Sequence, residues 1–295
     1  MKLAVVGSIN MDMTVCVERM PKKGETLLGD SLSYAPGGKG ANQAVAMARL
    51  GAEVWMFGCV GADGNGEAML NNLQSQGVHT EHIQVLQEVP TGLAIITVGE
   101  SDNMIIVVAG ANAKVDVSYA QSICPKLDAF DMVVLQHEIP LETVEYVINY
   151  CAEKGIKVML NPAPATQISE ELIEKITYLT PNEHETALIF GKGKDIKTLL
   201  QKYPEKLIIT RGSQGVIVGM KNQEIVQVPA KSVNVVDTTG AGDTFNGAFC
   251  VRITKGDSIK EALRFANTAA GLSTEKFGAQ AGMPAEEEVL AKRRI

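Results

Sequence analysis

The sequence VNVVDTTGAGDTFNGAF occupies residues 233–249. A β-branched run ends at Asp237, glycines follow at positions 240 and 242, and Asp243 begins a pattern typical of a helix. A glycine-rich turn that enters a helix favours anions, because free backbone N–H groups and the helix dipole point there. Two interpretations of Asp243 remain open from this stretch alone, a functional carboxylate and an ordinary helix N-cap. In either case the helix N-terminus is expected to favour the ionised form of Asp243.

Composition restricts the class of protein. The chain has 295 residues, 45% of them hydrophobic, which is enough for one large α/β domain. The formal charge is −7 and basic side chains occur only in small groups, so we expect no nucleic-acid partner. No apolar stretch approaches the roughly 20 residues needed to span a membrane. Five scattered cysteines without a CxxC pair indicate free thiols, so we expect a cytoplasmic protein.

Short apolar runs alternate with helical patterns along most of the chain. This alternation predicts an α/β fold with a parallel sheet covered by helices on both faces. The runs that indicate buried strands are 3–6, 54–60, 132–135, 158–160, 207–210 and 216–218. The segments between them that indicate helices include 40–50, 67–76, 141–154 and 170–176.

Two regions do not fit this alternation. Residues 13–34 contain β-like pieces and a Pro-Lys-Lys-Gly turn, and residues 91–108 indicate a β-hairpin with its turn near 99–103. We expect them to form a small β lid on a single domain that spans residues 1–295. The alternative is that they are edge strands of the central sheet.

Two further segments place polar side chains beside glycines. In APGGKGANQA, residues 35–44, three glycines surround a lysine, and Asn42 follows. In GSINMD, residues 7–12, Asn10 and Asp12 follow the first strand, at the edge of a parallel sheet where ligands usually bind. Contacts to a small polar ligand, close helix packing and Asx turns are all compatible with these segments. The P-loop and GxGxxG nucleotide motifs are absent.

Together these segments resemble the ribokinase family of carbohydrate kinases, over nearly the whole chain. The motifs that carry the resemblance, in the order shown by that family, are GSINMD, GGKGANQA, PTGLAIITV, NPAPA, TPNEHE and DTTGAGDTFNGA. The resemblance implies an α/β/α sandwich around a mostly parallel sheet, with a β lid through which two subunits form a homodimer. It also implies ATP-dependent phosphorylation of the 5-hydroxyl of D-ribose, giving ribose 5-phosphate and ADP. The alternatives are a family kinase for deoxyribose, adenosine or fructose, and a non-catalytic sugar-binding regulator.

The resemblance also assigns roles to individual positions. Asp243 corresponds to the catalytic base, and the backbone of Gly240, Ala241, Gly242 and Asp243 to the anion hole. The positions that match sugar contacts are Asn10, Asp12, Gly38, Lys39, Gly40, Asn42, Glu138 and Asp243. The positions that match nucleotide contacts are Asn182, Glu185, Thr210, Arg211, Gly212, Ser213, Gln214, Gly215, Gly242 and Asn267. Two alternatives stay open: Glu138 as a cap of the helix after Pro140, and Glu185 as an acid that only stabilises its own helix.

Two cations are implied in the same way. Asn182 and Glu185 match the motif that supports Mg²⁺ through water. The positions that match an activating monovalent cation, usually K⁺, are Asp237, Thr239, Ser273, Lys276, Gly278 and Gly282. The sequence departs from the family pattern at Gly282, where a serine hydroxyl is common, and at Asn267, where some members carry histidine.

Overall fold

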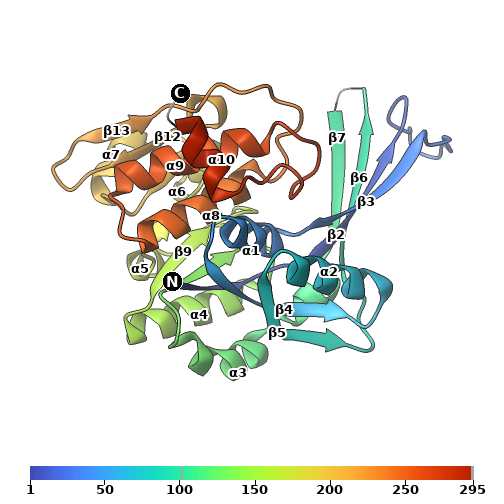
Figure 1. The fold of residues 1–295 in the computed structure, drawn as a ribbon, viewed down its shortest axis with the longest axis horizontal. Helices are drawn as coiled ribbons and strands as arrows, with labels where there is room; N and C mark the ends of the chain where they lie inside the picture. Colours follow the sequence, from blue (N-terminus) through green and yellow to red (C-terminus); the bar gives the residue numbers. More distant parts are fainter. Residues whose placement is uncertain (101, 294–295) are drawn as a thin grey trace.

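The centre of the computed structural model, which describes residues 1–100 and 102–293, is a six-stranded parallel sheet (Figure 1). The strand order is β10-β9-β8-β1-β4-β5, and every neighbouring pair is parallel. The strands are β1 (Lys2–Val6), β4 (Glu53–Gly61), β5 (Val78–Leu86), β8 (Met132–Gln136), β9 (Lys157–Asn161) and β10 (Tyr178–Leu179).

Helices cover both faces of this sheet because alternate side chains of each strand point to opposite sides. In β1, Leu3 and Val5 belong to one hydrophobic cluster, whereas Ala4 and Val6 belong to the other. The first cluster includes side chains of α1 (Lys39–Arg49), α2 (Gly64–Ser75), α8 (Ala241–Thr254), α9 (Ile259–Ser273) and α10 (Glu286–Arg293). The second includes side chains of α3 (Val117–Leu127), α4 (Leu141–Lys154), α5 (Glu170–Lys175) and α7 (Ile196–Lys202). The expected α/β/α sandwich is therefore confirmed.

A separate three-stranded sheet contains β11 (Ile208–Thr210), β12 (Val216–Gly219) and β13 (Ile225–Val228). Residues 207–210 and 216–218 were expected to join the parallel sheet. The first run does so only through isolated parallel bridges of Leu207 to Leu179 and of Thr210 to Asn182. The second run pairs antiparallel with β11, so for 216–218 the expectation is wrong. The turn between them is closed by the Arg211 N–H, which donates to the Gly215 carbonyl at 2.7 Å. It is too short for the crossover of about a dozen residues that a parallel connection needs. The helix α6 (Glu183–Phe190) and two 3-10 helices, η1 (Gly110–Lys114) and η2 (Gly212–Gln214), complete the described elements.

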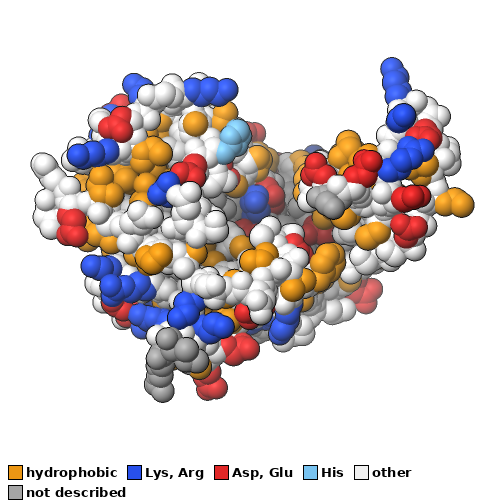
Figure 2. Space-filling model, turned by 90° about the horizontal axis from the view of Figure 1, so that it is seen from above, with side chains coloured by type: hydrophobic (Ala, Val, Ile, Leu, Met, Phe, Trp, Pro, Cys, Tyr) orange, Lys and Arg blue, Asp and Glu red, His pale blue; other side chains and the backbone are white. Residues whose placement is uncertain are grey.

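A four-stranded sheet projects from the main body and is called the lid below (Figure 1). It consists of β3 (Ser31–Gly37), β2 (Asn10–Cys16), β6 (Gly92–Gly99) and β7 (Asp102–Val108), in that order. These strands do not pair with the central sheet, so the interpretation as its edge strands is wrong. Residue 101, in the expected hairpin turn, lies outside the described residues. Figure 2 shows a hollow between the main body and the lid, with acidic and basic side chains in it.

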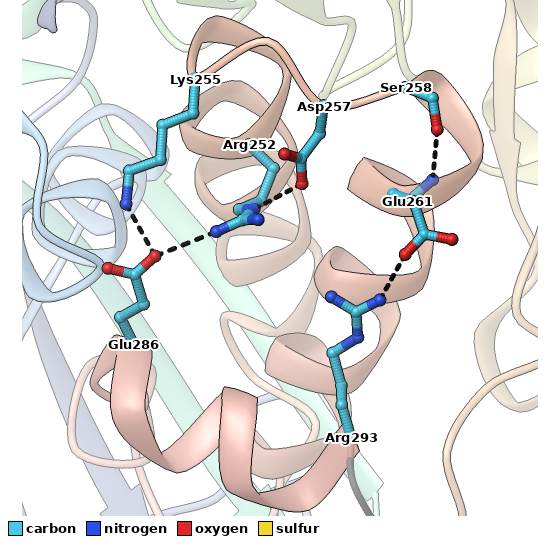
Figure 3. Close-up of polar contacts among 7 residues, drawn as sticks. All are labelled: Arg252, Lys255, Asp257, Ser258, Glu261, Glu286 and Arg293. Atoms are coloured by element: carbon cyan, nitrogen blue, oxygen red, sulfur yellow. Dashed lines mark hydrogen bonds and ion pairs between the residues drawn. The ribbon is translucent and has the colours of Figure 1, made fainter.

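Two separate groups of ion pairs join the three C-terminal helices (Figure 3). Arg293 of α10 donates to Glu261 of α9 at 2.6 Å, and a larger network joins α8 to α10. Arg252 donates to Asp257 at 2.7 Å and to Glu286 at 3.1 Å, and Lys255 donates to Glu286 at 2.7 Å. The Arg252 guanidinium also lies 5.0 Å from the ring centre of Phe265.

In the part of the chain that the structure describes, no helix is long and apolar enough to cross a membrane.

Candidate active site

Asp243 lies in the first turn of α8, and its side chain points toward α1. It is 6% exposed, and its two oxygens accept hydrogen bonds from Asn42 Nδ2 at 2.9 Å and Gln43 Nε2 at 3.0 Å. The helices approach closely because Gly247, one turn later, has no side chain: an added Cβ would lie 2.8 Å from the Ala46 Cβ. The N-cap of α8 is Gly240. The interpretation of Asp243 as an ordinary N-cap is therefore wrong.

The protonation of Asp243 is controlled by burial. Loss of hydration raises its pKa, and the charge of Lys39 and the amides of α1 offset only part of this effect. The expectation that the helix N-terminus would favour the ionised form is therefore wrong in its net direction, because desolvation is the larger influence. Lys39 itself has a raised pKa, chiefly because Asp243 lies near it.

Glu138 joins the end of β8 to the start of α1. Its Oε2 accepts hydrogen bonds from the Ser8 hydroxyl at 2.6 Å and from the Lys39 backbone N–H at 3.0 Å. The following helix, α4, has Pro140 at its N-cap and no side-chain cap. Glu138 therefore does not cap that helix, and the alternative for this residue is wrong.

Asp12 and Asn10 lie on β2, on the lid side of the same region. An added Cβ at Gly37 would overlap the Asp12 carboxylate, and one at Gly38 would lie 2.7 Å from the Asn10 backbone nitrogen. Glycines at both positions therefore let the loop before α1 lie against β2. Burial, followed by the charges of Glu138 and Asp243, raises the pKa of Asp12 to about 7.

Free backbone N–H groups lie at the start of α8. Gly240 has φ 75°, the left-handed conformation that favours glycine, and an added Cβ would lie 2.6 Å from the Ala279 carbonyl oxygen. The Ala241 N–H donates to the Thr238 carbonyl at 3.2 Å. Among the described residues, the N–H groups of Gly242 and Asp243 donate to no backbone carbonyl, so they are available to an anion.

Asn182 and Glu185 form a reciprocal cap of α6. Asn182 Oδ1 accepts from the Glu185 N–H, and Glu185 Oε2 accepts from the Asn182 N–H, both at 2.8 Å. This confirms that Glu185 stabilises its own helix. Burial raises its pKa, and both residues also line a cavity. The cavity has a volume of about 230 Å³, and its wall includes Lys39, Asn161, Asn182, Glu185, Thr210, Gly240, Gly242, Asp243 and Asn246.

The remaining nucleotide-matching positions divide into two groups. Thr210 ends β11 at the cavity, and Arg211, Gly212, Ser213, Gln214 and Gly215 form the turn that follows it. Arg211 Nε donates to Glu183 at 2.9 Å. Asn267 is buried in α9, and its Nδ2 donates to the carbonyls of Val228 at 2.8 Å and Pro229 at 3.1 Å. The structure thus places Asn267 away from the wall of this cavity.

Asp237 organises the segment that matches the cation site. Its Oδ1 accepts from the N–H and hydroxyl of Thr239 at 2.9 and 2.7 Å, and its Oδ2 accepts from the Gly278 N–H at 2.8 Å. Burial acts to raise the pKa of Asp237, but these hydrogen bonds outweigh it and the pKa is lowered. An added Cβ at Gly282 would overlap the Ser273 carbonyl oxygen, so a serine does not fit here without a backbone shift. Lys276 lies between Ser273 and Gly278 in the chain, in the bend before Gly278.

Sequence reasoning missed three amide side chains of this region. Gln43 is fully buried and bonds Asp243, and Gln136 Nε2 donates to Gln43 Oε1 at 2.8 Å. Gln280, which is 6% exposed, donates to Asn42 Oδ1 at 3.0 Å. Gln43 stands inside the GGKGANQA motif, which was the available signal for it. Among the described residues, no cluster of three or more His, Cys, Asp or Glu side chains could hold a metal ion.

Comparison with known proteins gives a consistent result. The model of the pfkB family carbohydrate kinases matches residues 1–286. The ribokinase of Bacillus subtilis (strain 168) is 49% identical over 287 residues, 97% of each chain. The ribokinase of Lactococcus lactis subsp. lactis is 45% identical, over 99% of this chain and 96% of that one. The structure of Arabidopsis thaliana ribokinase complexed with ribose and ATP superposes with a TM-score of 0.89, at 32% identity, over 99% of this chain and 98% of that one.

Proposed function

The chain belongs to the pfkB family of carbohydrate kinases, and from that membership we propose that it transfers the γ-phosphoryl group of ATP to the 5-hydroxyl of D-ribose. The products are ribose 5-phosphate and ADP. One observation carries this proposal: a buried carboxylate, Asp243, lies at a helix N-terminus, in a cavity shared with Lys39 and Glu185, and among the described residues no backbone carbonyl accepts from the N–H groups of Gly242 and Asp243. The identity to ribokinases along nearly the whole chain supports ribose as the acceptor.

In this proposal Asp243 accepts the proton of the attacking hydroxyl. The Asn42 and Gln43 amides each hold one of its oxygens, so the carboxylate is fixed in direction before the sugar binds. Burial raises its pKa, which makes the ionised form a stronger base. The N–H groups of Gly242 and Asp243 stabilise the charge that develops on the transferred group. Because phosphoryl transfer has a loose transition state, positioning contributes more than proton removal.

The sugar site lies between the main body and the lid. Asn10, Asp12, Asn42 and Glu138 supply side chains for the hydroxyls, together with the backbone of Gly38, Lys39 and Gly40. Asp12 and Asn10 are on a lid strand, whereas Asn42 and Glu138 belong to the main body. Movement of the lid would therefore close the site over the sugar and exclude water, which limits wasteful ATP hydrolysis.

ATP is proposed to lie along the turn formed by residues 210–215, beside the N-terminus of α6. Asn182 and Glu185 have side-chain oxygens at this cavity, which fits the preference of Mg²⁺ for oxygen ligands and retained water. Mg²⁺ bound with ATP would neutralise phosphate charge during transfer. Arg211 is held by Glu183, so its guanidinium is turned toward α6.

A monovalent cation, K⁺, is proposed beside the anion hole. Asp237, Thr239 and Gly278 are held together by three hydrogen bonds, and the neighbouring backbone carbonyls are ligands that suit such an ion. The proposed ligands include the Ser273 carbonyl. Lys276 and Gly282 would contribute only backbone groups. Gly282 leaves the set without the serine hydroxyl that is common at this position in the family pattern.

We propose that the lid is the interface of a homodimer. Leu32 and Tyr34 on β3 are 55% and 58% exposed, and Met104 and Ile106 on β7 are 58% and 61% exposed. Exposed apolar side chains on unpaired edge strands are typical of a protein interface.

We place the enzyme in the cytoplasm, where its five free cysteines would remain reduced and ATP is available.

An acceptor panel tests this function. Purified enzyme is assayed for ADP release with ribose, deoxyribose, fructose and adenosine, at saturating Mg²⁺-ATP, with and without K⁺. Ribose should give the highest kcat/KM, and K⁺ should raise turnover. A higher kcat/KM for another acceptor would refute ribose as the substrate, and an unchanged rate without K⁺ would refute the cation site. Light scattering of the wild type and of Ile106→Arg, which should be monomeric, tests the lid interface.

A further inference from the structure

A chain of three side-chain amides ends on Asp243. Asn72 Nδ2 of α2 donates to Gln280 Oε1 at 2.9 Å, Gln280 Nε2 donates to Asn42 Oδ1 at 3.0 Å, and Asn42 Nδ2 donates to Asp243 Oδ2 at 2.9 Å. Asn42 and Gln280 are 5% and 6% exposed. The chain therefore runs from the surface of α2 to the buried carboxylate.

The carboxylate fixes the direction of every amide in this chain. An ionised Asp243 only accepts hydrogen bonds, so Asn42 must present its NH₂ group to it and its oxygen to Gln280. Gln280 must then present its own NH₂ group to Asn42, and its oxygen to Asn72. Without Gln280, Asn42 Oδ1 would lose this hydrogen-bond partner, and the Asn42 amide would be held less firmly in the orientation that the carboxylate requires.

Gln280 is itself held firmly. Arg49 of α1 donates to the Gln280 backbone carbonyl at 2.7 Å and to the Met283 carbonyl at 2.8 Å. Gln280 closely follows Gly278, which bonds Asp237, and Ala279, whose carbonyl lies against Gly240. One short segment thus contacts the proposed cation site, the anion-hole turn and the amide that faces the base.

We propose that Gln280 is a positioning residue of this kinase: by holding Asn42 Oδ1, it keeps the Asn42 amide directed at Asp243. The proposal rests on the proposed function, in which Asp243 is the base. Asn42 keeps one donor hydrogen and one oxygen lone pair for the sugar. Loss of Gln280 should therefore reduce turnover more than it reduces sugar affinity.

Two variants and one control test the role. Gln280→Met keeps the length of the side chain but removes both hydrogen bonds, and should lower kcat about 10-fold with little change in the Kd for ribose. Gln280→Glu places an acceptor against Asn42 Oδ1, which favours the wrong amide orientation, and should lower kcat about 100-fold. Gln76→Leu is the control: it removes a different partner of Arg49, bonded at 2.8 Å, and should leave kcat within about twofold.

A double-mutant cycle separates positioning from packing. In an Asn42→Ala background, Gln280→Met should change kcat by less than about twofold, because the amide through which it acts is gone. Equal effects of Gln280→Met with and without Asn42 would overturn the proposal, as would a normal kcat in both Gln280 variants. Melting temperatures establish that each variant is folded, and Gln280→Glu replaces Gln280→Met in the cycle if the latter does not fold.

The activity of the wild type distinguishes a failure of this inference from a failure of the proposed function. If the wild type does not phosphorylate ribose but uses another sugar, ribose as substrate is refuted, and the same cycle is measured with that sugar. If the wild type turns over ribose and the cycle is additive, only the role of Gln280 is refuted.

Discussion

Replacing Asp12 by asparagine should change the pH dependence of folding stability. Burial and the neighbouring carboxylates raise the pKa of Asp12 from 3.8 to about 7. Between these two values the native state binds more protons than the unfolded state, so the free energy of unfolding falls as pH rises. The asparagine side chain of the variant cannot titrate, so this fall in the free energy of unfolding does not occur in the variant.

The size of the effect follows from the shift. One pKa unit corresponds to about 1.36 kcal/mol, so charging Asp12 in the native protein costs about 4 kcal/mol at pH 8 and about 1.7 kcal/mol at pH 5. The free energy of unfolding of Asp12→Asn, relative to that of the wild type, should therefore increase by about 2.5 kcal/mol between pH 5 and pH 8.

Urea denaturation followed by the fluorescence of Trp55 measures this quantity. Wild type and variant are unfolded without sugar or ATP at pH 5, 6, 7 and 8, and their unfolding free energies are compared. The difference should grow in favour of Asp12→Asn from pH 5 to pH 7 and level off toward pH 8, above the native pKa. A difference that stays constant across these four pH values would refute the reasoning, because the native and unfolded pKa of Asp12 would then be equal.

Three further predictions concern turnover and packing. Asp243→Asn should lower kcat about 10²–10⁴-fold in the ADP-release assay, with the Kd for ribose changed only a few-fold, because the amide cannot take the proton. Gly247→Val should lower the free energy of unfolding by about 1–3 kcal/mol in urea, since its Cβ would lie 2.8 Å from the Ala46 Cβ and push α8 from α1. Arg252→Ala should lower it by about 1–3 kcal/mol, because Glu286 loses a part-buried partner and α10 is held less firmly (Figure 3).

Each of these predictions has a matched control or a contrary outcome. Near-normal turnover by Asp243→Asn would remove this residue from catalysis. Gly242→Ala is the control for the glycine substitution: its Cβ would meet no atom within 4 Å, so stability should not fall and gains at most about 1 kcal/mol from helix propensity. Lys255→Ala, at a more exposed end of the same network, should cost less than about 1 kcal/mol; an equal or larger loss than Arg252→Ala would contradict the prediction.

Much of the main body was predictable because its strands are short continuous apolar runs. The exceptions in the central sheet are its two edge strands: β10 has only two residues, and β5, with the sequence VHTEHIQVL, is interrupted by polar residues. The pairing of β11 with β12 also escaped prediction as an antiparallel hairpin, because apolar pattern gives the presence of a strand but not its direction.

The candidate active site was also predictable only in part. The glycines at 37, 38, 240 and 247 stand out in the sequence, and the structure gives each a close neighbour that excludes a side chain. By contrast, nothing local indicates that Gln280 bonds Asn42, because 238 residues separate them. Contacts of this kind exist only after the chain has folded.

The sequence by itself determined four of the six strands of the central sheet, β1, β4, β8 and β9, and the family to which this protein belongs. Those features depend on local periodicity and on motifs such as DTTGAGDTFNGA, where the residues that matter are neighbours in the chain. The tertiary structure decided the electrostatics of Asp243. The helix N-terminus alone favours its ionised form, but folding buries the carboxylate between α8 and α1, and that burial raises its pKa. Solvation depends on every element packed around a group, so it is fixed only when Asn42, Gln43 and Lys39 are brought to it from a distant part of the chain.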